Sequence, residues 1–113
     1  MTAIDERVLG RLVDDLGRAS VHGLVATYLD ALGERRQRLA DAVAALDTTA
    51  ARKVAHQMRS TSLLVGAISL GEACAWLEAV SEAGDIDGVQ QAATDIAALA
   101  PTVARDLQAW LTR

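Results

Sequence analysis

Apolar residues recur every three or four positions along most of the chain, a spacing that is typical of one face of a helix. The first such segment, residues 4–17, ends at Gly17, and glycine commonly terminates helices because it tolerates left-handed backbone angles. We therefore predict a short helix there. Its apolar stripe consists of Val8, Leu12, Val13 and Leu16.

A longer helix is predicted next, with Ser20 as its N-cap. Its outer face carries the basic residues Arg35, Arg36 and Arg38. Its apolar stripe, which should face the core, consists of Leu24, Tyr28, Leu32, Leu39, Val43 and Leu46.

A third helix should contain His56 and weaken near Gly66, and its candidate N-caps are Asp47, Thr48 and Thr49. The segment Ser-Leu-Gly-Glu at residues 69–72 is typical of a capping box, in which Ser69 caps a fourth helix and Glu72 reaches back. We expect this fourth helix to close at Gly84 and to bury Leu70, Ala73, Cys74, Leu77 and Val80.

A final long helix is predicted from Ile86 onward, and Pro101 lies within it. An interior proline removes a backbone hydrogen bond and costs about 3 kcal/mol, so we expect a kink or break near Leu99. The apolar stripe of this segment consists of Val89, Ile96, Leu99, Val103, Leu107 and Trp110 or Leu111.

Neither strand-like alternation nor a hairpin turn signal separates these segments. Residues 1–113 are enough for one domain with one core and too few for two. Because short loops favour antiparallel neighbours, the sequence predicts an all-α fold, an antiparallel up-and-down four-helix bundle with an additional short N-terminal helix.

The composition excludes several classes of function. A net charge of −4 argues against nucleic acid as the main partner. No apolar stretch is long enough to span a membrane, and the chain does not start like a signal peptide. The single cysteine, Cys74, cannot form an internal disulfide and suits a reducing cytoplasm. The sequence has no zinc-ligand spacing and no glycine-rich nucleotide loop. A small helical module or an unusual small enzyme remains.

One of the two histidines, His56, is predicted to lie in the middle of its helix. At about 100° per residue, the residues within about 60° of it are Arg52, Lys53, Arg59, Ser60 and Leu63. Those roughly opposite, which should face the core, are Val54, Met58, Thr61 and Val65. His56 should therefore face solvent on a ridge of positive charge.

This setting favours a nucleophilic imidazole. Nearby cations disfavour a further positive charge on the His56 ring, and they would stabilise a phosphoryl group arriving at a free ring nitrogen. Arg59 can offer two donors in a fork, and Ser60 can offer a hydroxyl donor. Spacing alone leaves function open, because a surface histidine beside arginines is also common on ordinary amphipathic helices.

Residues 55–78, AHQMRSTSLLVGAISLGEACAWLE, resemble the phosphoacceptor segment of histidine-containing phosphotransfer (HPt) domains. The likeness has no gap, and a weaker one extends upstream, so it covers most of the chain. The family's fold is a four-helix bundle. The matching positions are Ala55, His56, Met58, Arg59, Thr61, Ser62, Val65, Gly66, Ala67, Leu70, Cys74, Leu77 and Glu78.

The resemblance implies that His56 takes a phosphoryl group from the aspartyl phosphate of one receiver domain and passes it to another, within a two-component phosphorelay. The receivers would belong to a response regulator or a hybrid histidine kinase. Such carriers have no kinase activity and need no cofactor, since Mg²⁺ belongs to the receiver. Arg59 is implied to stabilise the phosphoryl group. We expect a cytoplasmic monomer, and Nε2 of His56 as the reacting atom because it is the exposed tip of the ring.

Two positions depart from the family pattern. Arg59 replaces the usual lysine, which keeps the charge but adds bulk and a fixed plane. Ser60 replaces the usual glycine, where the absence of a side chain lets the receiver approach. The alternative hypothesis is therefore an HPt-like docking module that binds and regulates a receiver or kinase without accepting phosphate. A second alternative is the phosphotransferase domain of a chemotaxis kinase, although the initial Met makes a free-standing protein the simpler expectation.

The predicted docking surface surrounds His56. Arg52, Lys53 and Gln57 should form its rim, where charges steer encounter more than they add affinity. Leu63 should offer an apolar contact to a partner, unless a neighbouring helix covers it. Other residues are interpreted as packing: His22, Trp76 and Trp110 at the surface or boundary, and Cys74 in the core.

Overall fold

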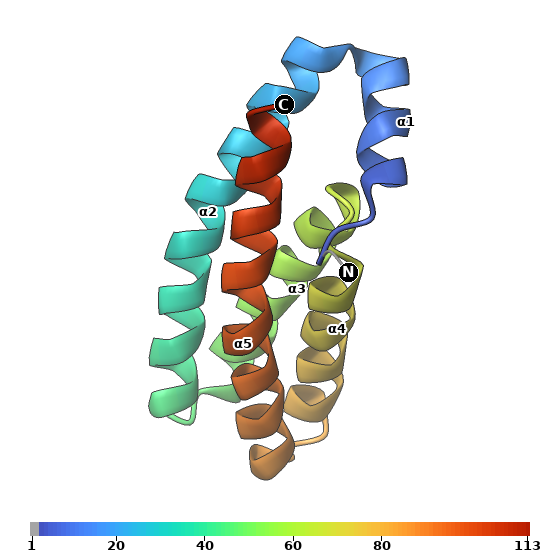
Figure 1. The fold of residues 1–113 in the computed structure, drawn as a ribbon. Coiled ribbons are helices and arrows are strands. Elements are labelled where there is room, and N and C mark those ends of the chain that lie inside the picture. Colours follow the sequence, from blue (N-terminus) through green and yellow to red (C-terminus); the bar gives the residue numbers. More distant parts are fainter. Residues whose placement is uncertain (1–2) are drawn as a thin grey trace.

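The computed structural model describes residues 3–113 and contains five α-helices. They are α1 (Glu6–Leu16), α2 (Arg18–Ala44), α3 (Thr48–Leu64), α4 (Ile68–Glu82) and α5 (Ile86–Leu111). Figure 1 shows α2 to α5 side by side along one long axis, with α1 beside one end of them. No β-strand occurs in the described part of the chain. The predicted bundle with a short N-terminal helix is confirmed.

The four long helices pack in a ring, each against two neighbours. α3 packs on α2 and α4, and α5 packs on α4 and α2. The α2–α5 pair therefore forms one side of the bundle and the α3–α4 pair forms the side opposite (Figure 1). This arrangement separates two surfaces of the molecule by the full thickness of the core.

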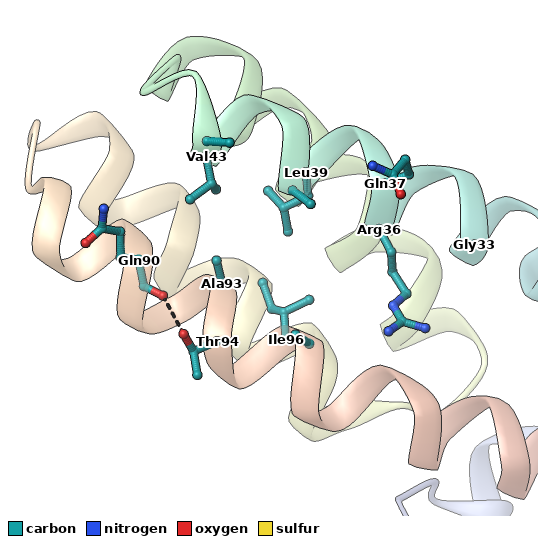
Figure 2. Close-up of a pocket in the computed structure, with 12 residues that line it drawn as sticks. Gly33, Arg36, Gln37, Leu39, Val43, Gln90, Ala93, Thr94 and Ile96 are labelled. Carbon is teal, nitrogen blue, oxygen red and sulfur yellow. Dashed lines mark hydrogen bonds between the residues drawn. The ribbon is translucent and has the colours of Figure 1, made fainter.

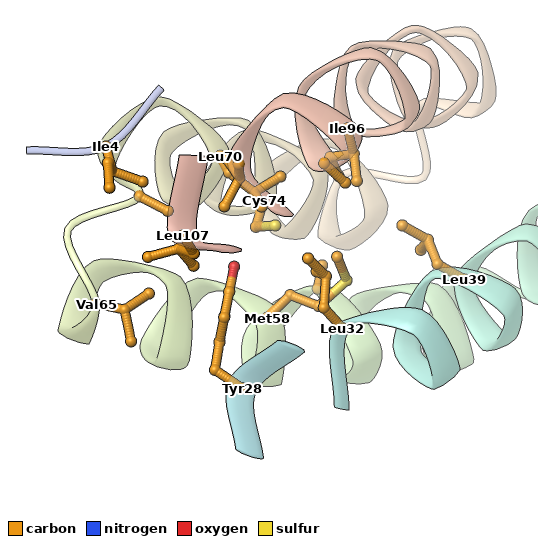
Figure 3. Packing of buried hydrophobic residues seen from close by; sticks show 14 of the residues in the cluster. Ile4, Tyr28, Leu32, Leu39, Met58, Val65, Leu70, Cys74, Ile96 and Leu107 are labelled. Atoms are coloured by element: carbon orange, nitrogen blue, oxygen red, sulfur yellow. The ribbon is translucent and has the colours of Figure 1, made fainter. Parts of the chain in front are cut away.

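The core is almost entirely aliphatic, as the scarcity of aromatic residues requires. Figure 3 shows side chains from every long helix meeting along the axis. The largest side chains that are fully buried are Leu9, Met58, Leu70, Leu77, Ile96 and Leu107. The stripe predicted for α2 is only partly right, because Leu46 is 60% exposed and the residues Val21, Val25 and Ala42 are buried instead.

Aspartates cap three of the helices. The Asp5, Asp47 and Asp85 carboxylates each accept a hydrogen bond from a backbone N–H in the first turn of α1, α3 and α5. Of the three caps proposed for α3, Asp47 is the one used. A short acceptor at this position satisfies a backbone donor that has no partner within the helix.

The predicted serine caps of α2 and α4 are wrong. α2 begins at Arg18, directly after Gly17, so Ser20 lies inside the helix. α4 begins at Ile68 after Ala67, which leaves Ser69 inside as well, and neither helix has a side-chain cap. In both places the preceding glycine turns the chain so tightly that the next helix starts before the serine.

Three of the interhelix turns share one hydrogen-bonding pattern. After α3, the Gly66 N–H donates to the Leu63 carbonyl and the Ala67 N–H donates to the Ser62 carbonyl, which is the Schellman closure. Equivalent bonds follow α4 around Gly84 and follow α2 around Leu46. This closure requires a left-handed residue, and Leu46 adopts φ 56° although it is not a glycine.

Pro101 does not break α5, which is one continuous helix from Ile86 to Leu111 (Figure 1). The predicted break is wrong because the residues on either side are anchored. Ala100 and Val103 are fully buried, whereas the proline ring is exposed. Core packing therefore holds the helix through the position at which one hydrogen bond is lost.

Within residues 3–113, no helix is both long and apolar enough to cross a membrane.

Candidate phosphoacceptor site

His56 lies in the middle of α3 with its side chain 61% exposed. The residues predicted to lie opposite, Val54 and Met58, are 8% and 1% exposed. The helical period therefore predicted the direction of the ring correctly, and the imidazole stands on the outer face of the bundle.

A carboxylate from the next helix holds the ring. Glu78 of α4 places Oε1 2.7 Å from Nδ1 of His56, and its side chain is only 16% exposed. An ionised carboxylate can only accept hydrogen bonds, so Nδ1 carries the proton in this contact. In the neutral ring the lone pair is then on Nε2, the nitrogen that points away from Glu78.

Arg59 lies against the other oxygen of the same carboxylate. Its Nη1 is 3.2 Å from Oε2 of Glu78, a close ion pair that lacks hydrogen-bond alignment, so this buried oxygen has no hydrogen bond among the described residues. Glu78 therefore lies between a guanidinium and an imidazole. The sequence predicted cations but no carboxylate beside His56, and it gave Glu78 no contact, although this residue ends the matching segment at residues 55–78.

The Ser60 hydroxyl is directed back along α3. Its Oγ donates to the backbone carbonyl of His56 at 3.3 Å, and the neighbouring Thr61 hydroxyl donates to the Gln57 carbonyl at 3.0 Å. Such back-bonding keeps a hydroxylated side chain close to its own helix. Ser60 therefore adds little bulk in front of the ring in this rotamer.

Arg35 does not belong to the outer face of α2, where the basic cluster was predicted. It is half-buried and its Nη1 donates to Oγ1 of Thr61 at 3.2 Å, which ties α2 to α3. Side-chain length explains the difference, because an arginine stem can lie along apolar surface while its head reaches a polar partner.

The other predicted site residues surround His56 at the surface. Arg52, Lys53 and Gln57 are exposed and, together with His56, line a shallow depression of about 320 Å³. Leu63 is 41% exposed, and a Cβ atom at Gly71 would lie 2.6 Å from its Cδ2. Leu63 therefore rests on α4 through the gap that Gly71 provides and still presents apolar surface to solvent.

A buried hydrogen bond beneath the site was not foreseen. The hydroxyls of Tyr28 and Ser62 are 2.7 Å apart, and Ser62 is completely buried. Burial raises the pKa of Tyr28 to about 12, and it also raises the pKa of Cys74 to about 12, with the Glu78 charge adding to the effect. Both groups are therefore neutral at physiological pH, and Cys74 is a packing residue as predicted.

The second histidine is remote from this site. His22 packs against Trp110 with ring centroids 5.1 Å apart, at the α2–α5 contact. Within residues 3–113, no group of three or more His, Cys, Asp or Glu side chains is placed to hold a metal ion. That the carrier works without its own metal or cofactor remains a prediction.

The sequence model of the Hpt domain family matches residues 23–112, which is most of the chain. The chain belongs to the Hpt domain family. It is therefore a histidine phosphotransfer protein of the kind found in phosphorelays, a family of phosphoryl carriers rather than kinases. The match begins within α2, so α1 lies outside it.

A solved structure has the same fold. The crystal structure of histidine-containing phosphotransfer protein B (HptB) from Pseudomonas aeruginosa PAO1 superposes with a TM-score of 0.92 and covers 98% of this chain and 96% of its own. The two sequences are 24% identical, so this likeness concerns the fold. The comparison with curated proteins gave no match.

Proposed function

We propose that this Hpt domain relays phosphoryl groups between receiver-domain aspartates through Nε2 of His56. The main support for this proposal is the contact between the exposed His56 ring and the partly buried Glu78 carboxylate. With Nδ1–H donating to Glu78, the lone pair of Nε2 would face outward. In the forward step the Nε2 lone pair forms a bond to phosphorus, while the bond from phosphorus to the aspartyl oxygen breaks and leaves a carboxylate on the receiver. The return step is the reverse on a second receiver.

Glu78 would support this step through the ring. When Nε2 bonds to phosphorus the imidazole gains positive charge, and a carboxylate 2.7 Å from Nδ1 stabilises that charge. Because Glu78 touches the ring and not the phosphoryl group, its proposed role is to position the ring and its proton.

Cations would neutralise the phosphoryl oxygens. Arg59 is partly exposed one turn beyond His56, and a short movement away from Glu78 would present its guanidinium to those oxygens. Arg52 and Lys53 lie on the other side of the ring, at the rim of the same depression. Phosphoryl transfer requires mainly positioning and charge neutralisation, which this arrangement offers. Mg²⁺ would belong to the receiver.

The partner would dock on the α3 surface around the ring. Leu63 and Leu64 are 41% and 45% exposed and supply the apolar part, while Arg52, Lys53 and Gln57 supply the polar rim. This combination suits the short-lived complex that a relay needs. The proposed partner is the receiver domain of a response regulator or of a hybrid histidine kinase.

Transfer from a panel of phosphorylated receiver domains tests the proposal, with wild type compared with His56→Gln. We expect an acid-labile, alkali-stable label on the wild type alone, because phosphohistidine has that stability. A receiver that binds both proteins but labels neither would instead establish the docking module, the alternative that Ser60 at the usual glycine position supports. In that case Ser60→Gly should restore transfer.

A further inference from the structure

A groove of about 700 Å³ runs between α2 and α5 (Figure 2). It lies on the α2–α5 side of the bundle, whereas His56 is on α3, on the other side. Its floor is apolar and is formed by Leu39 and Ile96, which are 3% and 1% exposed. The groove belongs to no part of the proposed phosphoacceptor site, whose residues all lie on α3 and α4.

Small side chains form the walls of this α2–α5 groove. On α2 the lining includes Gly33, Ala40 and Ala44, which recur at intervals of seven and four residues, and α5 contributes Ala93 and Ala97, four residues apart. These intervals are those of helical stripes, so both helices present small residues along the same trough. Stripes of small residues let the backbone of another helix approach closely.

Among the described residues, Arg36 is the one charged residue that lines the groove. Its half-buried side chain extends from α2 toward α5 (Figure 2), and it has no hydrogen bond or ion pair with any of residues 3–113. The carboxylates of Asp41 and Asp95, on the same two helices, accept hydrogen bonds from Gln37 and Gln91, and neither lines the groove. A guanidinium held over an apolar trough without an acid is complementary to an occupant that carries negative charge.

We propose that the α2–α5 groove binds an amphipathic helix of a partner protein, with a carboxylate of that helix paired to Arg36. The lining of α2 spans Gly33 to Ala44, about 16 Å at 1.5 Å per residue, which is three turns of a bound helix. The apolar floor accommodates the apolar stripe of that helix, and the polar ends of Gln37, Gln90 and Thr94 form a rim.

Binding on this side leaves the imidazole accessible. The described residues that line the groove belong to α2 and α5, whereas His56 and its partner Glu78 come from α3 and α4. A partner helix could therefore hold the protein while a receiver docks on the opposite side. This inference does not depend on the proposed function, since it concerns a different surface and a different class of contact.

Two synthetic probes test the proposal on the full chain. Each is a helical peptide of about 18 residues, or five turns, with a leucine stripe that contains one glutamate or, in the matched peptide, one lysine. Binding is followed through the backbone amide signals of ¹⁵N-labelled protein. We expect the glutamate peptide to shift the amides of Gly33, Ala40 and Ala97 saturably, and to bind at least about 10-fold more tightly than the lysine peptide.

Variants identify the contact. Arg36→Glu should reverse the preference between the two peptides, whereas Arg38→Glu, the same charge change on an exposed residue of α2 outside the groove, should preserve it. Ala40→Trp should fill the groove and weaken both peptides. Circular dichroism establishes that each variant is folded.

Four outcomes would overturn the proposal. They are shifts confined to the α3 surface, equal binding of the two peptides, equal behaviour of the Arg36 and Arg38 variants, and occupation of the groove by something else. The last case would appear either as self-association that Ala40→Trp abolishes, which makes a second copy the occupant, or as the same amide shifts produced by dodecanoate, which makes a small amphiphile the occupant.

Discussion

The α3–α4 side and the α2–α5 side of the bundle are both concave and both carry arginine, yet they are built differently. On the α3–α4 side the reactive ring has a charged partner of its own, because Glu78 lies between His56 and Arg59. On the α2–α5 side the floor is apolar and Arg36 has no partner among residues 3–113. The contacts of the first surface orient the His56 ring. The second surface instead provides an apolar groove and the unpaired charge of Arg36.

This difference separates reaction from recognition. A reacting ring needs an internal partner that sets its proton and its angle, and an error of about 1 Å can cost about 100-fold in rate. A docking trough instead needs little internal contact, because the partner supplies what is missing. Variants on the two sides should therefore affect different measurements.

The largest expected effect comes from Glu78→Ala. Without the carboxylate the ring loses the acceptor for Nδ1–H, and we expect phosphoryl transfer to slow by roughly 100-fold. Glu78→Gln should lose less, because an amide oxygen still accepts from Nδ1–H. Samples of the reaction that are quenched at successive times give the rate of phosphoryl transfer. The ¹⁵N chemical shifts of the imidazole show which tautomer is present. Unchanged tautomer populations of His56 in Glu78→Ala would contradict the positioning role of Glu78. As a control, this variant should bind peptides in the α2–α5 groove as the wild type does.

The next largest effect is expected from the buried hydrogen bond between Tyr28 and Ser62. Tyr28→Phe leaves the buried Ser62 hydroxyl without its partner, so the free energy of unfolding should fall by about 1–3 kcal/mol. Urea denaturation measures this loss. The double variant Tyr28→Phe with Ser62→Ala removes both polar groups and should recover part of the stability. A double variant as unstable as the sum of the singles would show that the hydrogen bond is not the cause.

A smaller change, a gain in the free energy of unfolding, is expected from a substitution at the end of α2, beyond the groove. Leu46 holds a left-handed φ of 56° while its side chain is 60% exposed, so Leu46→Gly should relieve strain and lose little burial. We expect a gain of about 1 kcal/mol in the free energy of unfolding. Leu46→Ala is the matched control, since it shortens the side chain but keeps the Cβ atom that causes the strain. Equal changes in both variants would refute this explanation.

The smallest expected effect is a loss of folding stability at alkaline pH. Burial raises the pKa of the Tyr28 phenol from 10.0 to about 12, so the unfolded chain releases this proton before the folded chain does. The stabilisation is complete below pH 10 and declines as the pH rises toward 12. The raised pKa of Cys74 acts in the same direction from pH 9 upward. Urea midpoints across this range should fall more gently in Tyr28→Phe than in wild type.

The sequence by itself determined the helices and the direction of His56. Apolar residues at helical spacing specify which face is buried, so the period that buries Val54 and Met58 also turns His56 outward. The likeness of residues 55–78 to the family's phosphoacceptor segment rests on the same local information. The cap of this helix could be narrowed to Asp47, Thr48 or Thr49 for the same reason, because a cap acts within one turn of its helix, and the structure uses Asp47.

Only the tertiary structure decided which side chains meet across helices. The contact from Glu78 to His56 depends on the register of α4 against α3, and the bond from Arg35 to Thr61 depends on how α2 lies on α3. The tertiary structure also overrode local preferences, since core packing carried α5 through Pro101 and the hydrogen-bonded turn after α2 holds Leu46 in a left-handed conformation. The α2–α5 groove exists because two stripes of small residues face each other, and that distance is set by the whole core.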